Sequence, residues 1–313
     1  MKRVKVQLST KKELKRSVKK NTNRINKSLS TKDKMRIRQV ELDFDSGKDS
    51  KAKYSKNGRY LSSRIKIHNL IIKKILSKDK STKNPDIYIF GGVGGSGKGS
   101  LKHFIKETTL TVNNDDIKMA LAKYNPSGSK YKLLHAGYLH REAKDIEEKV
   151  VEKLLRLKKD IILDRTISNF KSNYNLLKKF QSRGYKIHTL GTNLKPHIAI
   201  TRATTRFLKG DEGRYVPLNE LARKGNSLNK NAVRMARSKI NSSSLIVNTK
   251  SKSPSVLYSK NFSKEAIRTG KKKIKTGFSK KKIKKKKYSL TKKRTKKRSN
   301  KSSISFNFSK IFG

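Results

Sequence analysis

Ile87-Tyr-Ile-Phe-Gly-Gly-Val-Gly-Gly-Ser-Gly-Lys-Gly-Ser-Leu101 runs from an apolar strand through a glycine-rich loop to the start of a helix. The part from Gly92 to Lys98 fits the pattern G-x-x-x-x-G-K in the place where a phosphate-binding loop (P-loop) requires it. The glycines let the backbone wrap tightly, so its N–H groups can surround a phosphate while Lys98 reaches the β and γ phosphates of ATP. We therefore predict that the following residues bind ATP: Gly92, Gly94, Gly95, Ser96, Gly97, Lys98, Gly99 and Ser100.

The residue after Lys98 is Gly99, where many P-loops place the Ser or Thr that binds Mg²⁺, and Ser100 follows. The string Gly-Ser-Gly-Lys-Gly-Ser resembles the loop of nucleoside monophosphate kinases, which have the same displacement. This favours a kinase over a switch GTPase. The direct Mg²⁺ ligand stays open at this point, and the candidates are Ser100 and Asp164, which ends a later strand.

Apolar runs alternate with amphipathic segments over residues 85–260, the predicted kinase domain. The expected strands are 87–90, 110–112, 160–163, 186–190 and 245–247. The expected helices lie near 98–107, 115–124, 138–158, 169–183, 196–208 and 217–240. This alternation predicts an α/β fold of P-loop kinase type, with a parallel sheet covered by helices on both faces. Ligands then lie beyond the carboxyl ends of the strands.

Basic flanks enclose the predicted domain. Residues 1–60 have too few apolar residues for a core, so we expect a basic N-terminal arm with one lone helix after the capping box Thr10–Glu13. Residues 61–84 carry apolar residues at helical spacing, which predicts a lead-in helix packed on the domain. Residues 261–313 form blocks of lysine that repel one another, which predicts a disordered tail.

The chain of 313 residues has a formal net charge of +60. Residues 251–313 alone contain 23 basic residues against one acidic residue. Such a surplus predicts non-specific binding to nucleic acid or another polyanion through the basic flanks. The lack of cysteine excludes disulfides and thiolate metal sites. No apolar stretch reaches membrane-spanning length. We expect a soluble intracellular protein without a membrane partner, with the nucleus or another compartment rich in nucleic acid as an alternative location.

Two carboxylates follow the second predicted strand, in Val112-Asn-Asn-Asp-Asp-Ile-Lys118. A carboxylate at the tip of a strand beside the P-loop strand stands across the cleft from the γ-phosphate. There it can orient and deprotonate an attacking hydroxyl. Asp115 and Asp116 are both candidates, and the alternative for Asp116 is that it caps a helix starting at Ile117.

With these motifs in order, roughly residues 60–258 resemble the zeta toxin family of P-loop kinases. The family's segment after the second strand is matched by Asn113-Asn-Asp-Asp-Ile-Lys118, and the resemblance implies that Asp115 is the general base. Asn113 replaces the family's first aspartate. The string Asp164-Arg-Thr166 is similar to the family's Asp/Glu-Gly-Thr, with Arg165 in place of the glycine.

The resemblance also implies residues for the acceptor and for the phosphates. Spacing back from Asp164 places the family's substrate-binding glutamate on Glu148, with Glu142 as the alternative. A plain alternative is that these glutamates form a solvated helix face paired with lysines. Asp116 and Thr166 complete the expected substrate-binding set. Two arginines that close over the phosphates in the family correspond to Arg206 and Arg214.

The sequence therefore predicts an ATP- and Mg²⁺-dependent kinase that moves the γ-phosphate onto a hydroxyl of a small molecule. The resemblance implies a nucleotide sugar such as UDP-N-acetylglucosamine as acceptor. Two alternatives remain open. The first is a polynucleotide 5′-hydroxyl kinase, in which the basic flanks hold the strand. The second is a nucleic-acid-binding or packaging protein whose kinase domain is weak or inactive.

Overall fold

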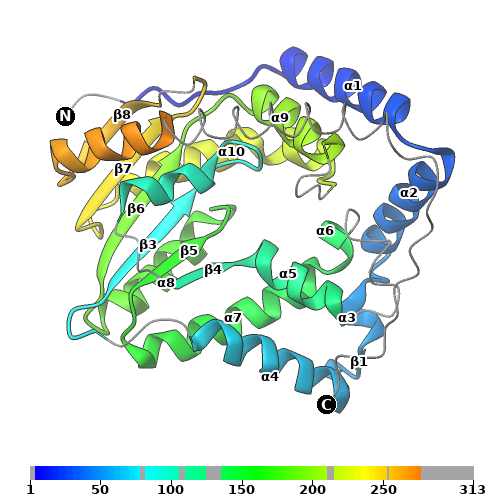
Figure 1. Ribbon diagram of the computed structural model, residues 1–313, viewed down its shortest axis with the longest axis horizontal. Coiled ribbons are helices and arrows are strands. Elements are labelled where there is room, and N and C mark those ends of the chain that lie inside the picture. The colour runs from blue at the N-terminus through cyan, green and yellow to red at the C-terminus, as the bar shows by residue number, and fades with distance from the viewer. Residues whose placement is uncertain are drawn as a thin grey trace, which may run out of the picture.

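The computed structural model describes residues 4–77, 82–105, 110–124, 135–209, 215–251 and 254–275 (Figure 1). Its centre is a six-stranded sheet in the order β4-β5-β3-β6-β7-β8. The first five of these strands are parallel, and β8 joins β7 antiparallel. The strand bounds are β3 Asp86–Gly91, β4 Leu110–Asn113, β5 Ile161–Asp164, β6 Lys186–Thr192, β7 Ser243–Asn248 and β8 Ser255–Lys260.

The strand that leads into the P-loop, β3, lies in the middle of this sheet between β5 and β6. In the register, Phe90 of β3 lies opposite Asp164 of β5, which in turn lies opposite Asn113 of β4. Parallel strands end at the same edge, so the tips of β3, β4 and β5 come together there. The sequence prediction of a P-loop kinase-type parallel sheet is confirmed.

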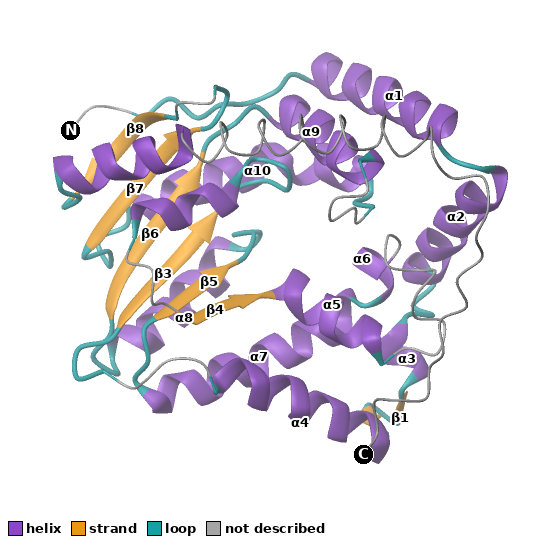
Figure 2. Cartoon of the chain, in the orientation of Figure 1, coloured by secondary structure: helices purple, strands orange, loops and turns teal. Residues whose placement is uncertain are grey.

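Helices cover both faces of the sheet, as predicted (Figure 2). On one face, α7, α8 and α10 pack on a cluster that includes Ile87, Ile89 and Leu163. On the other face, Phe90 and Leu190 belong to a second cluster. The helices of the domain are α5 Asn114–Lys123, α6 His135–Tyr138, α7 His140–Leu157, α8 Phe170–Gln181, α9 Pro196–Leu208 and α10 Leu218–Ala236. No helix in the described part of the chain is long and apolar enough to cross a bilayer.

The second face is covered differently from the sequence prediction. The segment after the P-loop is a 3-10 helix, η1 (Lys98–Phe104), and not the expected α-helix. The rest of the cover is a helix over residues 264–275, which the prediction assigned to the disordered tail. Its Ile274 is 5% exposed, and Gly270 lies against the Phe104 ring. The lysine block contains apolar residues at helical spacing, Ile267 and Ile274, which pack on the sheet. The expectation of disorder is therefore wrong up to residue 275. Residues 276–313 lie outside the described part.

The N-terminal flank is also more structured than predicted. It contains α1 Lys11–Ser28, α2 Thr31–Asp45, α3 Ser50–Lys53 and a small hairpin of β1 Ser55–Lys56 and β2 Arg59–Tyr60. The expected capping box at Thr10 and Glu13 is present. The expectation of one lone helix without a core is wrong, because Val4, Ile25 and Ile37 are buried against the rest of the chain. The helices run around the edge of the domain from α9 towards α7 (Figure 1). The domain boundaries drawn from sequence stay a prediction.

The lead-in helix α4 (Ser62–Leu76) is joined to α7 by a buried ionic cluster. The Arg64 guanidinium donates to both oxygens of the fully buried Glu142 carboxylate, at 2.5 and 3.0 Å. The Nε2 atom of His68 lies 2.7 Å from Glu142 Oε1. Burial alone would raise the pKa of Glu142, but the hydrogen bonds from His68 and Arg64 outweigh it and lower that pKa to about 2.

This cluster predicts an acid-sensitive contribution to stability. The Glu142 pKa is depressed from 4.5 to about 2, so its contribution is complete above pH 4.5 and is lost as pH falls towards 2. Glu142→Gln should lower the free energy of unfolding at neutral pH by about 3–5 kcal/mol, because Arg64 is then left as an uncompensated buried charge. Denaturant unfolding at pH 7 and pH 3 measures both effects.

Glu148→Gln on the same helix is the matched control. Its carboxylate is exposed and pairs only loosely with Lys144, at 3.7 Å. Its effect should stay under about 1 kcal/mol. Equal losses for Glu142→Gln and Glu148→Gln would contradict a special role for the buried cluster.

Candidate functional site

The P-loop follows β3 and owes its shape to glycines. Gly92, Gly95 and Gly97 have φ angles of 137°, 83° and 85°, a region that favours residues without a side chain. A Cβ atom on Gly95 would lie less than 3.0 Å from the backbone oxygen of Ala199 in α9. The loop therefore lies directly against the α9 backbone, and its amide groups line a cradle of the kind that binds phosphate.

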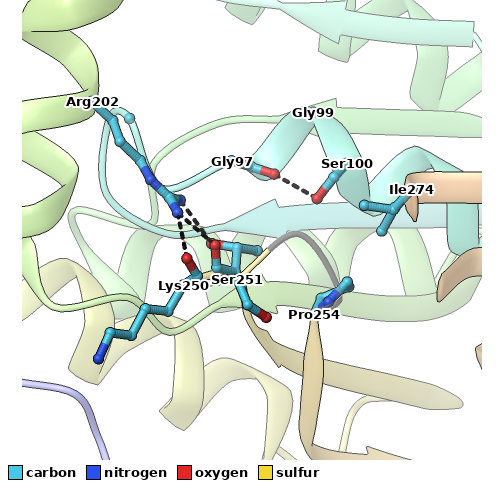
Figure 3. Close-up of a pocket in the computed structure, with 10 residues that line it drawn as sticks. Gly97, Gly99, Ser100, Arg202, Lys250, Ser251, Pro254 and Ile274 are labelled. Atoms are coloured by element: carbon cyan, nitrogen blue, oxygen red, sulfur yellow. Dashed lines mark hydrogen bonds between the residues drawn. The ribbon is translucent and has the colours of Figure 1, made fainter. Parts of the chain in front are cut away.

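A cavity of about 410 Å³ opens beside this loop (Figure 3). Arg202 of α9 lines one side, and the segment Thr249–Ser251 after β7 lines another. Arg202 donates to the backbone oxygens of Thr249 and Lys250, at 2.7 and 3.1 Å. The Thr249 hydroxyl donates to the backbone oxygen of Ser96 at 2.5 Å. The P-loop, α9 and the loop after β7 are thus joined into one wall. The remaining lining residues are Gly95, Gly97, Gly99, Ser100, Pro254 and Ile274.

The predicted ATP-binding residues lie together in this loop. Lys98 Nζ donates to the Gly92 carbonyl at 3.3 Å, so its ammonium group folds over the loop. Ser96 is fully buried, and its hydroxyl lies 2.5 Å from that of Thr192. Ser100 is half-buried, and its hydroxyl donates to the Gly97 carbonyl at 2.8 Å.

The two predicted carboxylates lie at the tip of β4, at the start of α5. This helix begins at Asn114, close to the expected start near 115 and before the start at Ile117 that a cap at Asp116 would require. Its N-cap is Asn113, whose side-chain oxygen accepts from the Asp115 amide at 2.8 Å. The capping role considered for Asp116 is therefore wrong, since Asn113 fills it. Asp115 Oδ1 pairs with Lys118 Nζ at 3.3 Å, whereas the Asp116 side chain is exposed.

The glutamate that faces this region is Glu147, which the sequence analysis did not select. Glu147 is 3% exposed, and its carboxylate lies 3.1 Å from Arg165 Nη2 and accepts from Asn114 at 3.2 Å. Burial raises the pKa of Glu147, and Arg165 partly opposes the rise. A signal was present, because Glu147 lies on the apolar stripe of α7 with Ala143 and Val150.

The two glutamates named from sequence lie elsewhere. Glu148 is on the exposed face of α7, where it pairs with Lys144 as the plain alternative expected. Glu142 faces α4, and both of its oxygens are held by Arg64 and His68. Neither is brought next to Asp115 by a contact among the described residues.

The other predicted residues lie around the same sheet edge. Asp164 ends β5, and Thr166 follows it with an exposed side chain. Arg206 is half-buried on α9, and its Nε has no acceptor among the described residues. Arg214 lies outside the described residues. Arg202, which the prediction did not select, is the arginine that lines the cavity.

The described residues contain no group of three or more His, Cys, Asp or Glu side chains able to hold a metal ion by themselves. Ser100 and Asp164 offer one hydroxyl and one carboxylate at the edge where the P-loop begins. Such a sparse oxygen set fits Mg²⁺, which keeps several waters and is held mainly by the phosphates of a nucleotide.

Comparison with known proteins assigns this architecture to a family. The sequence of residues 72–263 matches the zeta toxin family. The chain belongs to the zeta toxin family. The match begins inside α4 and ends just before the helix over 264–275, so α1 to α3 and that last helix lie outside it. This membership supports a P-loop phosphotransferase. No curated protein matches the sequence of the chain.

Two solved structures of the AvrRxo1-ORF1:AvrRxo1-ORF2 complex share the fold of this zeta toxin family member. The complex with sulphate ions is 16% identical with a TM-score of 0.53, covering 64% of this chain and 69% of that chain. The native complex is 16% identical with a TM-score of 0.52, covering 70% and 74%. A chain of the PezAT chromosomal toxin–antitoxin system of Streptococcus pneumoniae is also 16% identical, with a TM-score of 0.49 and coverage of 67% and 87%.

The contact between Gly95 and α9 gives a test of the P-loop geometry. Gly95→Ala should lower the melting temperature and weaken ATP binding, because the new methyl group would meet the Ala199 carbonyl and the backbone has φ +83°. We expect a loss of roughly 1–3 kcal/mol in the free energy of unfolding. Thermal unfolding and titration with ATP measure the two effects.

Gly99→Ala is the control for thermal stability. A Cβ atom on Gly99 meets nothing within 4 Å. Its melting temperature should therefore stay near that of the wild type. A Gly95→Ala protein that is as stable as Gly99→Ala would contradict the close approach of α9 to the loop.

Proposed function

We propose that this zeta toxin family member is an ATP-dependent kinase that transfers the γ-phosphate to a hydroxyl of a small molecule. The observation that carries the proposal is the convergence of the P-loop with the tips of β4 and β5 at one edge of the sheet. That edge presents a phosphate cradle, Lys98, and the carboxylates of Asp115 and Asp164. A reaction between a nucleotide and a hydroxyl needs these groups side by side.

The phosphates of ATP would lie along the P-loop, with the β and γ phosphates meeting the Lys98 ammonium group. The cavity beside Arg202 and Thr249 would take the nucleoside end, because it opens directly from Gly97 and Ser100. The bond from Lys98 to the Gly92 carbonyl is a single hydrogen bond at 3.3 Å. Phosphate oxygens carry more charge than a carbonyl and would displace it.

Asp115 would accept the proton of the attacking hydroxyl, as the family resemblance implies. Its ion pair with Lys118, at 3.3 Å, orients the carboxylate at the start of α5. Arg206, and Arg214 outside the described residues, would neutralise the charge that spreads over the γ-phosphate oxygens during transfer. The Arg206 Nε atom, without an acceptor among the described residues, fits a group whose partner arrives with the substrate.

Mg²⁺ would be held by the nucleotide phosphates together with Ser100 and Asp164. When bound, it neutralises phosphate charge and orients the γ-phosphate.

The acceptor would lie against Glu147 and Asn114. The Asn114 Oδ1 atom is buried without a hydrogen-bond donor among the described residues, and Glu147 beside it is buried as well. Buried acceptor oxygens at the base of a site suit the hydroxyls of a sugar. This supports a nucleotide sugar such as UDP-N-acetylglucosamine as acceptor, with Asp116 and Thr166 nearer the exposed rim. The high net charge of +60 keeps a 5′-hydroxyl oligonucleotide as a second candidate acceptor.

A transfer assay tests the function. The protein is incubated with γ-labelled ATP, Mg²⁺ and separate pools of nucleotide sugars, nucleosides and 5′-hydroxyl oligonucleotides. We expect label in the nucleotide-sugar pool and none with Lys98→Ala, which lacks the charge that meets the β and γ phosphates. Label only in the oligonucleotide pool would favour the polynucleotide kinase. No label above Lys98→Ala in any pool would remove the kinase proposal and favour a binding protein.

The general base is tested by a pair of neighbouring variants. Asp115→Asn should keep ATP binding and reduce transfer by roughly 10²- to 10⁴-fold, because an amide cannot accept the hydroxyl proton. Asp116→Asn should have a much smaller effect, since its side chain is exposed. ATP titration and initial rates separate binding from transfer. The reverse ranking would assign the base to Asp116.

A further inference from the structure

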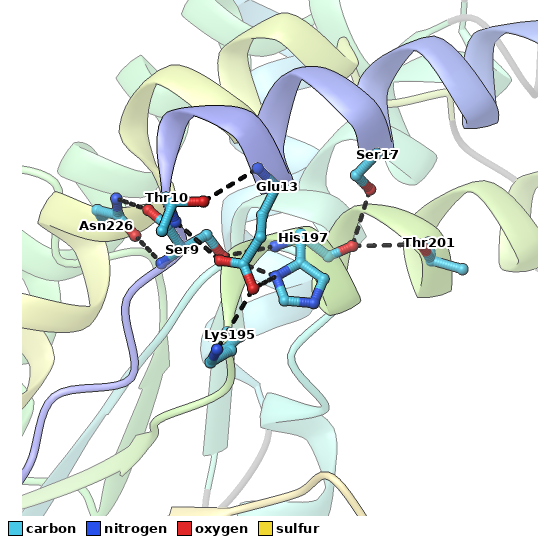
Figure 4. Close-up of polar contacts among 8 residues, drawn as sticks. All are labelled: Ser9, Thr10, Glu13, Ser17, Lys195, His197, Thr201 and Asn226. Atoms are coloured by element: carbon cyan, nitrogen blue, oxygen red, sulfur yellow. Dashed lines mark hydrogen bonds and ion pairs between the residues drawn. The ribbon is translucent and has the colours of Figure 1, made fainter.

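The N-terminal segment that contains α1 lies outside the part of the chain that matches the zeta toxin family. It packs along α9, the helix that carries Arg202 and Arg206. Figure 4 shows the contacts of α1 with the first turns of α9. We propose that α1 is a positioning element of the phosphoryl-transfer site, which fixes the rotation of α9 and so the placement of these two arginines. The inference rests on the proposed function for its activity readout.

The hydrogen bonds between the two helices recur at each turn of α9. Ser17 Oγ donates to the His197 backbone oxygen at 3.0 Å. Asn21 Nδ2 lies 3.2 Å from the Thr201 hydroxyl, and Arg24 Nη2 lies 3.2 Å from the Thr205 hydroxyl. Residues 197, 201 and 205 are four apart and therefore form one face of the helix. The three contacts hold this whole face, and not only one end of α9.

The α1 side of the contact is itself held rigidly. Asn21 is fully buried, and its amide also donates to the Ser17 backbone oxygen at 2.8 Å. Its own oxygen accepts from Arg24 Nη1 at 3.0 Å. Buried polar groups that are satisfied in this way fix a single arrangement, because any shift would leave one of them without a partner.

The start of α1 is tied to the start of α9 and to α10. The Ser9 hydroxyl accepts from the His197 amide at 3.2 Å and lies 3.0 Å from His197 Nδ1. Asn226 of α10 pairs with both the amide and the carbonyl of Ser9, at 2.9 and 2.8 Å. Glu13, in the capping box of α1, lies 3.4 Å from Lys195 Nζ. The register of α1 along α9 is therefore set at both ends.

The held face of α9 controls the arginine face through helix geometry. Arg202 and Arg206 each follow directly after a held threonine, so they lie about 100° further around the helix. A rotation of α9 by one-tenth of a turn would move the end of a long arginine side chain by several ångströms, and even about 1 Å of misplacement is costly in catalysis. Arg202 is joined to Thr249, and Thr249 to Ser96 in the P-loop. The path from Asn21 to the P-loop is thus a continuous set of packed and hydrogen-bonded residues.

Single substitutions in the full chain test the proposal. Arg24→Ala removes the contact beside Arg206, and it should lower kcat about tenfold with little change in KM for ATP. Asn21→Ala removes the contact beside Arg202, and it should raise KM for ATP several-fold. Arg24→Lys should recover part of the lost kcat. Rates are measured well below the melting temperature of each variant.

Arg16→Ala is the matched control for Arg24→Ala. Arg16 is exposed on α1, so the same loss of charge and length occurs away from α9. It should have wild-type kcat and KM. A second check comes from Thr205→Val, which removes the partner hydroxyl. Arg24→Ala and Thr205→Val both remove the same Arg24–Thr205 contact. The kcat of the double variant should therefore be no lower than that of the slower single variant.

Amide hydrogen exchange tests the same contact without enzyme turnover. Asn21→Ala should raise exchange in residues 201–208 by roughly tenfold, and Arg16→Ala should not. If the wild-type protein shows no transfer activity, the proposed function is refuted. The exchange experiment then still tests the contact between α1 and α9, because it needs no activity. The positioning role of α1 is overturned if Arg24→Ala and Asn21→Ala match Arg16→Ala in exchange, or in kcat and KM. It is also overturned if both variants lose kcat equally with no change in KM.

Discussion

The site depends on the close contact between the P-loop and α9, which is possible only because residue 95 has no side chain. The Ala199 carbonyl occupies the space that a Cβ atom on Gly95 would need. Once α9 lies there, Arg202 reaches Thr249, and Thr249 reaches the backbone of Ser96. The walls of the cavity therefore depend on Gly95 and on α9, whose backbone occupies the space of the missing side chain. The central place of β3 in the sheet brings the tips of β4 and β5 to the same point.

Charge has two different uses in this very basic chain. Most lysines and arginines in the described part of the chain are not buried, and the net charge of +60 gives the protein a long-range positive potential. A few form ion pairs in which at least one partner is buried: Arg64 with Glu142, Lys118 with Asp115, and Arg165 with Glu147. The first pair joins α4 to α7, the second lies within α5, and the third joins the end of β5 to α7. The acidic residues are scarce, 22 in the whole chain, and three of them form these pairs.

The sequence was sufficient for the P-loop and for the five parallel strands of the central sheet. Five of the six strands and the order of strands and helices follow from short apolar runs and from glycines, which are local signals. The edge strand β8 was missed, because apolar and polar residues alternate only weakly in Ser255–Lys260 and few of its residues are apolar. The helix over 264–275 was missed because Ile267 and Ile274 lie among lysines, and blocks of lysine predict disorder.

The candidate site was harder to predict than the fold, because its geometry depends on contacts between distant segments. The family resemblance, with spacing counted back from Asp164, gave Glu148, whereas the helical face of α7 places Glu147 inwards. Asn113 seemed a lost aspartate, but the structure uses it as the N-cap of α5. The docking of α1 could not be foreseen, since its buried polar contacts with α9 join residues about 180 positions apart. The sequence of α1 alone does not indicate the helix on which it packs.

This separation has a consequence for the order in which the protein is made. A ribosome adds about 5–20 residues per second, so roughly 10–40 seconds pass between the synthesis of Asn21 and that of Thr201. During this time α1 has emerged without the surface that it later covers, and its Leu14, Val18 and Ile25 have no permanent partner. Helix α1 is thus synthesised well before the helix on which it packs. The polar composition of α1 limits the apolar surface that the helix exposes during this interval.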